Sequence, residues 1–496
     1  MASNSRIASF RNIMKGTVIF GGTQMLTMLV NLVRGKLVAV LLGAYGIGIN
    51  SLLQSAIQPV QQFFSFGLPT SGVTSISNSS TLEDKTQLYT TVTAFRRIML
   101  VLAAMSIVFM VVSAKWLNMF TFNVEDSFTK WFMALGLAVF FMILTACNNT
   151  ILQGCRCLKR LAMCNIAGPV IGLFIGIPLY YFMGVRGIAP AIILMSFTTW
   201  AYTQWHVQKL HFEHVEQSWA ETFSIGKKMI YLGGIIMIAG LLGNITIYLI
   251  NTFIRSYGNI YDVGYYQSAT TVTTQCTALV FTALATDYFP HLASLKDNFQ
   301  KTLQLVNQEG EIVLLLCAPL TILLIIFAPL IVRVLLTEDF DVIVPVIQMM
   351  AITFMMRAVF FPLDYIYIAN GDKTFFFWIE GIFLNLKMLI IMISGYYLYG
   401  LEGLGYAIII NGFIDIIASI MLIKWRYGIT YNKKYYAVLL PCFIINICAL
   451  AAALLLDGMI SWGVMIALGV VQITFSLIEI NKRVDLFKIL RKVVRR

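Results

Sequence analysis

Gly184-Val-Arg-Gly-Ile-Ala-Pro-Ala-Ile-Ile193 returns 216 residues later as Gly400-Leu-Glu-Gly-Leu-Gly-Tyr-Ala-Ile-Ile409. A second pair of similar stretches, Tyr45-Gly-Ile-Gly48 and Tyr261-Asp-Val-Gly264, has the same offset. Gly154 and Gly371 are 217 residues apart. Three matches in the same order at nearly one offset indicate an internal duplication. Each lies at the edge of an apolar segment, so the duplication concerns a group of membrane-spanning helices.

The composition places the chain in the membrane. Of its 496 residues 59% are hydrophobic and only 12% are charged, and the mean hydropathy is +0.82. A soluble protein of this size could not bury so much apolar surface, which predicts an all-α polytopic membrane protein. Apolar windows of about 20 residues predict about fourteen transmembrane helices, over 17–42, 47–78, 94–114, 129–152, 162–183, 187–206, 229–254, 263–288, 311–333, 342–369, 374–397, 404–424, 435–456 and 460–480.

The basic residues predict the orientation of these spans. If the N-terminus is cytoplasmic, most of the 35 Lys and Arg lie on the cytoplasmic side, as the positive-inside rule requires. Both termini are then cytoplasmic, and no cleaved signal peptide is expected, because the first span exceeds signal-peptide length. Membrane orientation also accounts for the net charge of +12 without a nucleic-acid partner. The basic residues left outside are Lys115, Lys130, Arg186, Arg255 and Arg333.

The repeat unit holds about six spans, an even number, so both copies have the same orientation in the membrane. We expect two six-helix bundles related by a pseudo-two-fold axis along the membrane normal, with a cavity between them. The predicted parts are an N-terminal bundle at 1–210, a cytoplasmic linker at 211–228, a C-terminal bundle at 229–425, and two additional helices with a basic cytoplasmic tail at 426–496.

Two stretches carry a resemblance to a known family: Gly35-Lys-Leu-Val-Ala-Val-Leu-Leu-Gly-Ala-Tyr-Gly-Ile-Gly48, and Gly264-Tyr-Tyr-Gln267 followed by Asp287-Tyr-Phe-Pro-His-Leu-Ala-Ser294. They resemble the MATE-like (multidrug/oligosaccharidyl-lipid/polysaccharide) transporter superfamily, and in particular its Wzx-type polysaccharide or O-antigen flippases. The layout of fourteen spans is similar throughout, but only these stretches are specific.

The resemblance implies translocation of an undecaprenyl-diphosphate-linked oligosaccharide, such as an O-antigen repeat unit, from the cytoplasmic to the outer leaflet of a bacterial inner membrane. Alternating access of the two bundles is the implied mechanism, and polysaccharide polymerase machinery is a candidate partner. The protein would be a transporter and not an enzyme. No cofactor is expected, since no nucleotide-binding motif is present, and the eight cysteines have no metal-ligand spacing.

Cations inside apolar spans are the main clue to the cargo. Insertion scales put the cost of such a charge at about 2.5–3.5 kcal/mol, so these residues usually face water or a partner. Arginine binds phosphate through a two-pronged fork and lysine binds it as a point charge, which favours an anionic head group. Snorkelling or a structural ion pair is the alternative. The predicted substrate-binding residues are Arg34, Lys36, Arg255, Arg357 and Lys387.

Two of these predictions depend on local geometry. Side chains two positions apart on a helix point in nearly opposite directions, so Arg34 and Lys36 meet one ligand only if the helix bends at Gly35. Arg255 ends the seventh span, where contact with phosphate at the outer mouth and anchoring at the interface are equally good interpretations.

Four acids are candidates for coupling transport to H⁺ or Na⁺: Asp287, Asp364, Glu380 and Asp415. The alternative for each is the role of counter-ion to a buried cation. Arg357 and Asp364 are seven residues apart, as are Glu380 and Lys387. That spacing puts each pair on one helix face but about 10 Å apart along the axis, too far for direct contact.

Two other functions remain open. A MATE-type cation-coupled drug exporter would share the fold, but exporters of cations need an acidic or neutral cavity. A membrane glycosyltransferase or polymerase would usually carry a large catalytic loop, and every predicted loop here is short.

Overall fold

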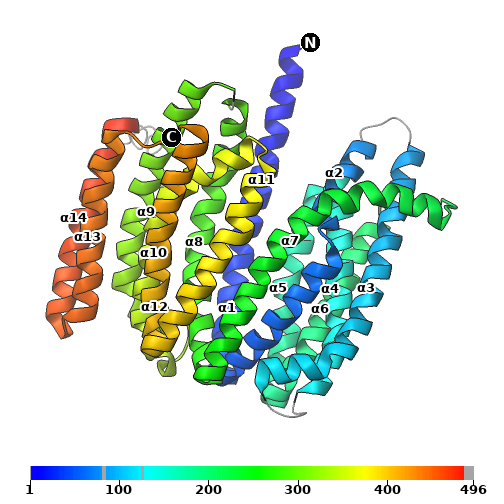
Figure 1. Ribbon diagram of the computed structural model, residues 1–496, viewed down its shortest axis with the longest axis horizontal. Helices are drawn as coiled ribbons and strands as arrows, with labels where there is room; N and C mark the ends of the chain where they lie inside the picture. Colours follow the sequence, from blue (N-terminus) through cyan, green and yellow to red (C-terminus); the bar gives the residue numbers. More distant parts are fainter. Residues whose placement is uncertain (1, 81–84, 124–127, 214, 296, 485–496) are drawn as a thin grey trace. The chain divides into compact units, whose positions relative to one another are not determined.

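A computed structural model describes residues 2–80, 85–123, 128–213, 215–295 and 297–484, apart from the side chains of 2–21, 24, 228, 232, 235, 236, 279, 283, 286, 287 and 484. Every regular element in these ranges is helical, as predicted (Figure 1). The long helices are α1 (Ala2–Ser65), α2 (Leu68–Ser80), α3 (Lys85–Phe122), α4 (Thr129–Gly154), α5 (Leu158–Met183), α6 (Ile188–Gln208), α7 (Trp219–Tyr257), α8 (Ile260–Leu295), α9 (Phe299–Leu335), α10 (Val344–Ala369), α12 (Leu384–Tyr427), α13 (Lys433–Leu455) and α14 (Gly458–Val484). Shorter elements are the 3-10 helices η1 (Gly184–Gly187) and η2 (Glu338–Ile343), the helix α11 (Lys373–Phe376) and the π-helix η3 (Phe377–Phe383).

The described residues hold 10 helical stretches that are long and apolar enough to cross a membrane. Three of these, Met25–Ser80, Leu158–Gln208 and Lys373–Tyr427, have 56, 51 and 55 residues, more than twice the length of about 20 that one crossing needs. Each is interrupted by a glycine with positive φ: Gly43, Gly184 or Gly400. The chain is thus a multi-pass α-helical membrane protein, and fourteen crossings stay a prediction.

The duplication is visible in the backbone. Gly184 has φ 55° and ψ −135°, and its counterpart Gly400 has φ 58° and ψ −136°. A Cβ on Gly187 would lie 2.5 Å from the carbonyl oxygen of Leu179, and a Cβ on Gly403 would lie 1.9 Å from that of Gly395. The two pairs are again 216 residues apart, so the repeated stretch folds into the same reverse turn twice.

A second repeated turn joins α4 to α5 and α10 to α11. In the first, the amide groups of 155, 156, 157 and 158 donate to the carbonyl oxygens of 151, 153, 152 and 156. In the second, the amide groups of 370, 371, 372 and 373 donate to those of 366, 368, 367 and 371. Each turn has one residue with positive φ, Arg156 in the first and Gly371 in the second. The Gly154 and Gly371 match therefore marks a repeated structure, although the structural offset is 215.

Packing divides the chain into two compact units. Unit 1 comprises Met1–Gly264 and Glu380–Asn385. In it α4 packs against α3 and α6, α5 packs against α1 and α6, and α7 packs against α1, α2 and α3. The second predicted span is broken at Phe66 and Gly67, which both have positive φ. Gly67 permits this break because it passes directly over Gly233 of α7.

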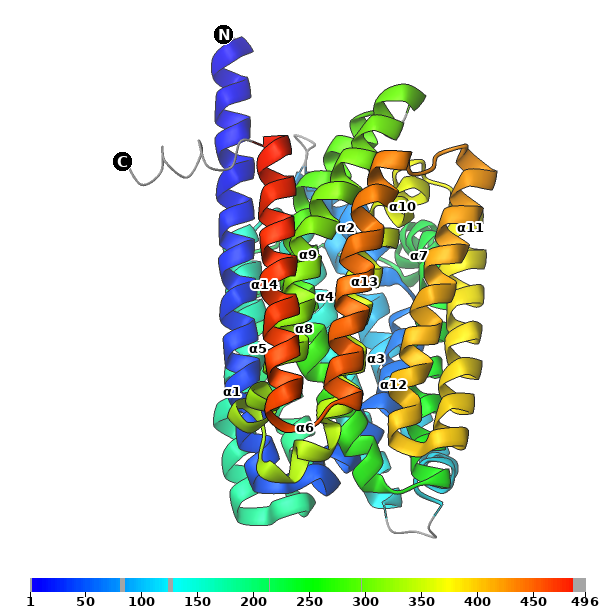
Figure 2. The same cartoon turned by 90° about the vertical axis from the view of Figure 1, so that its left-hand side faces the viewer.

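Unit 2 comprises Tyr265–Ile379 and Leu386–Arg496. Helix α9 is its centre, because α10, α13 and α14 all pack against it. Figure 2 shows α13 and α14 running side by side, and they are also in contact. Two apolar clusters fill the unit, one around Tyr288, Tyr367 and Tyr435 and the other around Ile325 and Met356.

The predicted bundles at 1–210 and 229–425 are defined by the repeat, whereas the compact units are defined by packing and divide within α8. The two partitions rest on different properties of the chain, so the bundles stay a prediction. The predicted linker 211–228 is partly helical. Helix α7 begins at Trp219, where Ser218 and Glu221 form a reciprocal capping box.

Candidate functional site

Within unit 1 the two copies of the Tyr-x-x-Gly stretch cross each other. A Cβ on Gly48 would lie 2.1 Å from the carbonyl oxygen of Ile260, and a Cβ on Gly264 would lie 1.9 Å from that of Ala44. The rings of Tyr45 and Tyr261 lie 5.4 Å apart. Each partner is related to the other by the 216-residue offset, so the contact is its own mirror in sequence. This is the arrangement that a local pseudo-two-fold axis produces.

A shallow pocket of about 380 Å³ opens beside this crossing. It is lined by Tyr45 and Tyr261 and by Arg255, Ser256 and Asn259 at the turn between α7 and α8. Burial lowers the solvation of the Arg255 guanidinium, which is half-buried. No carboxylate lies within 4.0 Å of it among the described residues. Arg255 therefore faces a small polar opening at a predicted outer turn.

Arg34 lies where α1 meets α5 and α6. Its Nη2 is 3.5 Å from Sδ of Met195, a Cβ on Gly172 would approach its Nη1 to 2.9 Å, and it interacts with the hydroxyl of Tyr180. None of these neighbours is acidic. The ion pairs of the described chain do not include Arg34.

Lys36 is half-buried and has contacts of its own. The predicted bend between it and Arg34 is wrong, because α1 stays helical through Gly35 and departs from helical geometry at Gly43, with φ 61° and ψ −170°. Lys36 and Arg34 therefore lie on different faces of α1. One ligand group cannot contact both side chains through a local bend.

Arg357 belongs to α10, most of whose residues are buried, yet its own side chain is exposed. Its Cζ lies 4.9 Å from the ring centroid of Phe281 on α8, and no described carboxylate lies within 4.0 Å of it. An arginine in mid-span costs least when it faces water. Its exposure on an otherwise buried helix is typical of an aqueous cavity.

Helix α8 adds a polar stripe that the analysis of the sequence missed. Gln267, Thr271 and Thr274 follow one another at helical spacing, and the two threonines are exposed. Nε2 of Gln267 donates to Oγ1 of Thr271 at 3.3 Å. The signal was present as the run Ser268-Ala-Thr-Thr-Val-Thr-Thr-Gln275, and α8 is absent from the helices apolar enough to span a membrane. Hydroxyl and amide groups are costly against lipid, so this face indicates water.

Lys387 forms a buried ion pair. Its Nζ contacts Oδ1 of Asp415 and lies 3.5 Å from the carbonyl oxygen of Asn411, while Nδ2 of Asn411 donates to Oδ2 of Asp415 at 3.0 Å. The side chains of Lys387 and Asp415 are only 9% and 15% exposed. The turn at Gly400 folds the two halves of α12 against each other, which brings together residues 28 positions apart. The counter-ion alternative thus describes Asp415.

The other three acids are placed differently. Asp364 accepts a hydrogen bond of 3.0 Å from Oγ of Ser419. Glu380 lies in the π-helix η3, where its carbonyl oxygen accepts a 2.7 Å bond from Nδ2 of Asn385. The side chain of Asp287 lies outside the described residues. Lys387 therefore pairs with Asp415, and the seven-residue spacing from Glu380 does not set its partner.

The sequence matches a known family. A family model described as "Polysaccharide biosynthesis protein" matches residues 48–345, which is more than half of the chain. The chain belongs to this polysaccharide biosynthesis protein family. Its matched region includes the Tyr261–Gly264 stretch and the polar face of α8. No curated protein sequence matches the chain.

Solved structures show the fold of this family member. It is similar to the lipid II flippase MurJ in an inward closed conformation, with a TM-score of 0.70, 15% identity, and coverage of 95% of this chain and 100% of that one. It is also similar to an inward-facing multidrug resistance MATE family transporter of the MOP superfamily, with a TM-score of 0.68, 14% identity, and coverage of 85% and 98%.

A third similar structure is a MOP superfamily transporter from Pyrococcus furiosus, described as having a binding pocket of reversed polarity, with a TM-score of 0.60, 15% identity, and coverage of 84% and 96%. At these identities the likeness shows the fold alone. Together with the family match, it confirms the resemblance to polysaccharide flippases of the MATE-like superfamily.

Proposed function

We propose that this protein is a flippase that moves an undecaprenyl-diphosphate-linked oligosaccharide, such as an O-antigen repeat unit, from the cytoplasmic to the outer leaflet of a bacterial inner membrane. The polar glycan crosses in a wet cavity between two bundles that alternate in access. The prenyl chain stays in lipid, where it loses nothing, whereas each unpaired sugar hydroxyl would cost several kcal/mol there. Both termini are cytoplasmic in this proposal.

The observation that carries the proposal is that three guanidinium groups, those of Arg34, Arg255 and Arg357, have no carboxylate partner among the described residues. Structural arginines in membranes are usually paired. Unneutralised guanidinium groups suit a diphosphate, whose oxygens accept two parallel hydrogen bonds from one arginine. Lys36 and Lys387 would add positive potential, although Lys387 is neutralised in part by Asp415. Cationic drugs would be repelled by such a cavity.

Coupling to H⁺ or Na⁺ would involve the acids that do not serve as counter-ion to Lys387. Asp364 and Glu380 are the better candidates, and Asp287 is a third. The aqueous wall would include the polar stripe of α8 and the exposed Arg357. Polysaccharide polymerase machinery would receive the product on the outer side.

The first test is export in a bacterial strain depleted of its own flippase. The full-length chain should restore surface polysaccharide, and Arg34→Ala and Arg357→Ala should reduce export by about 10- to 100-fold, the loss expected for one bidentate charge-assisted hydrogen bond. Arg186→Ala is the matched control, because Arg186 is exposed in a predicted outer loop. Full export by both R34A and R357A, at wild-type abundance in the membrane, would refute the cationic site.

A further inference from the structure

A second polar site lies in unit 2, built from residues other than the cations described above. It is a pocket of about 890 Å³ between the first turns of α9, the loop that joins α12 to α13, and the end of α14. Helix α9 has 37 residues and is therefore about 55 Å long, well beyond a hydrocarbon core of about 30 Å. Its apolar part begins at Ile312, so the pocket lies at the polar end of α9. The predicted topology puts all three of these segments in the cytoplasm.

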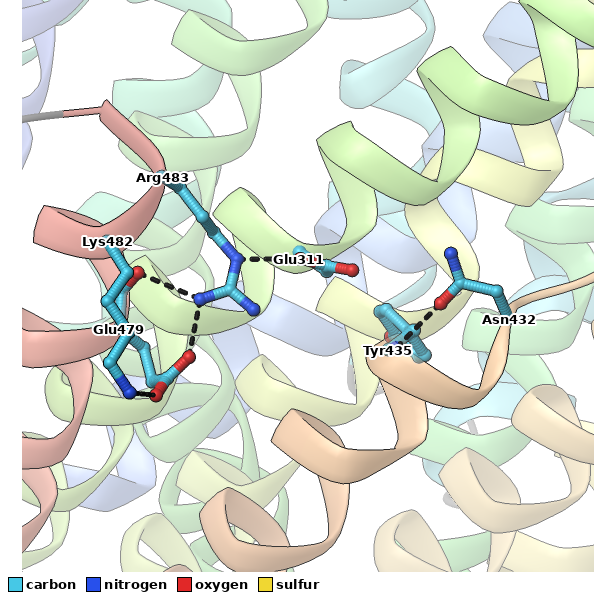
Figure 3. A network of polar contacts seen from close by, with 6 residues as sticks. All are labelled: Glu311, Asn432, Tyr435, Glu479, Lys482 and Arg483. Atoms are coloured by element: carbon cyan, nitrogen blue, oxygen red, sulfur yellow. Dashed lines mark hydrogen bonds and ion pairs between the residues drawn. The ribbon is translucent and has the colours of Figure 1, made fainter.

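The charged groups of this pocket neutralise one another (Figure 3). Nε of Arg483 is 2.6 Å from Oε2 of Glu311, and its Nη1 is 2.6 Å from Oε2 of Glu479. Oε1 of Glu479 also accepts from Nζ of Lys482 at 2.7 Å. Two acids and two bases thus form a closed set, and the Arg483 fork is already occupied. A phosphate would have to displace a carboxylate to bind it.

The loop that forms the opposite wall is rigid. Nδ2 of Asn307 donates to the carbonyl oxygen of Thr430 at 3.3 Å, and its Oδ1 accepts from the amide group of Asn432 at 2.8 Å. Oδ1 of Asn432 in turn caps α13 by accepting from the amide group of Tyr435 at 2.8 Å. Tyr431 is buried and stacks on Tyr435 with ring centroids 3.7 Å apart. The wall is therefore formed before any ligand arrives.

The groups that remain for a ligand are amides. Gln300, Gln304 and Gln308 line the pocket on successive turns of α9, and all three are exposed. None of them hydrogen-bonds to another described residue through its side chain. At a rise of about 1.5 Å per residue they are spaced about 6 Å apart along the helix. Each amide offers both donors and an acceptor, which matches a sugar hydroxyl, itself donor and acceptor.

We propose that this pocket binds the neutral part of an oligosaccharide at the cytoplasmic end of unit 2. This inference rests on the proposed function, since it assigns a docking site to the glycan of the same cargo, separate from the diphosphate site. The three-rung row of free amides fits an extended chain of a few pyranose rings. The self-neutralised charges disfavour a diphosphate or a strongly charged peptide, and leave Lys434 as the one cation of the lining outside the closed set.

The test is direct binding of two neutral trisaccharides, maltotriose and triacetylchitotriose, and of inorganic pyrophosphate to the purified full-length protein in nanodiscs. Gln304→Ala removes the central amide from an exposed position. Gln87→Ala removes an equally exposed glutamine from α3 and is the matched control. At least one trisaccharide should bind wild type and Q87A equally, and Q304A should bind it about 3- to 10-fold more weakly, as expected for one or two hydrogen bonds.

Pyrophosphate binding should be unchanged in Q304A and weakened in R357A. Failure of both trisaccharides to bind wild type, or equal affinity for Q304A and Q87A, would overturn the glycan pocket. Loss of export in Q304A with trisaccharide affinity intact would also overturn it and would point to a protein partner at this surface. These binding data involve no transport, so they can fail while the flippase assay succeeds, and the reverse.

Discussion

Alanine at Gly48 or Gly264 should force apart the crossing between the two copies of the repeat. The new Cβ would lie 2.1 Å or 1.9 Å from a backbone carbonyl oxygen, whereas real Cβ contacts are essentially never under 3.0 Å. Because the obstacle is backbone, α1 and α8 must separate by about 1 Å. Overpacking of this kind costs about 1–3 kcal/mol, and separation also weakens the Tyr45 and Tyr261 contact, worth about 0.5–1.5 kcal/mol.

Alanine also gains about 0.5–1 kcal/mol over glycine in a helix, so the expected net loss is about 1–3 kcal/mol in the free energy of unfolding. Gly35→Ala is the control, because Gly35 lies on the same helix and no atom lies within 4 Å of the place that its Cβ would occupy. It should leave stability unchanged or raise it slightly. The double variant of Gly48 and Gly264 should lose less than the sum of the two, since one separation relieves both contacts.

The assay is the thermal unfolding midpoint of the purified protein in detergent, together with its abundance in membranes. G48A and G264A should both melt below G35A, and the double variant should melt only slightly below either. Midpoints of G48A and G264A equal to that of G35A would refute the close crossing. Strictly additive losses would refute the claim that both glycines serve one contact.

Three further predictions concern the same architecture. Lys387→Met or Asp415→Asn alone should destabilise the protein by about 3–5 kcal/mol, because each leaves a buried charge unpaired, while the double variant should recover most of that loss in a denaturation series. Asp372→Asn should abolish an acid-side loss of stability: the Phe375 amide group, then Arg426 and Tyr427, hold the pKa of Asp372 below its ordinary value, so its contribution is full above that ordinary value and disappears as pH falls through the lowered one, which a melting-point profile against pH would show. Gly184→Ala and Gly400→Ala should each cost about 1–2 kcal/mol, measured by thermal melting, because both glycines have positive φ with open space around them; unequal costs would contradict a shared turn.

The sequence predicted those parts of the fold that repeat or alternate with regular spacing. The 216-residue offset predicted that Gly184 and Gly400 have equivalent roles, and their dihedral angles agree within a few degrees. It could not predict that Gly43 rather than Gly35 interrupts α1, since both glycines lie in apolar surroundings and tertiary contacts decide between them. The break at Phe66 was likewise hidden, because it depends on the passage over Gly233.

The candidate site was predicted less completely. The intramembrane cations could be found from charge alone, and exposure separates Arg357 from the paired Lys387. The Lys387 and Asp415 pair could not be predicted from helical spacing, because the turn at Gly400 brings the two residues together. The polar stripe of α8 and the amides of α9 left only a local excess of Thr and Gln, whose meaning depends on which helix face is exposed.

The most direct test of the proposed function is transfer across vesicles that contain only the purified full-length protein. The substrate is an undecaprenyl-diphosphate-linked oligosaccharide isolated from the depleted strain, and an added glycosidase reports which leaflet exposes the glycan. Wild type and R186A should transfer the lipid at the same rate, and R357A should be at least about tenfold slower, the loss of one charge-assisted contact. Transfer by R357A at the wild-type rate, or no transfer by wild type above protein-free vesicles, would contradict the account.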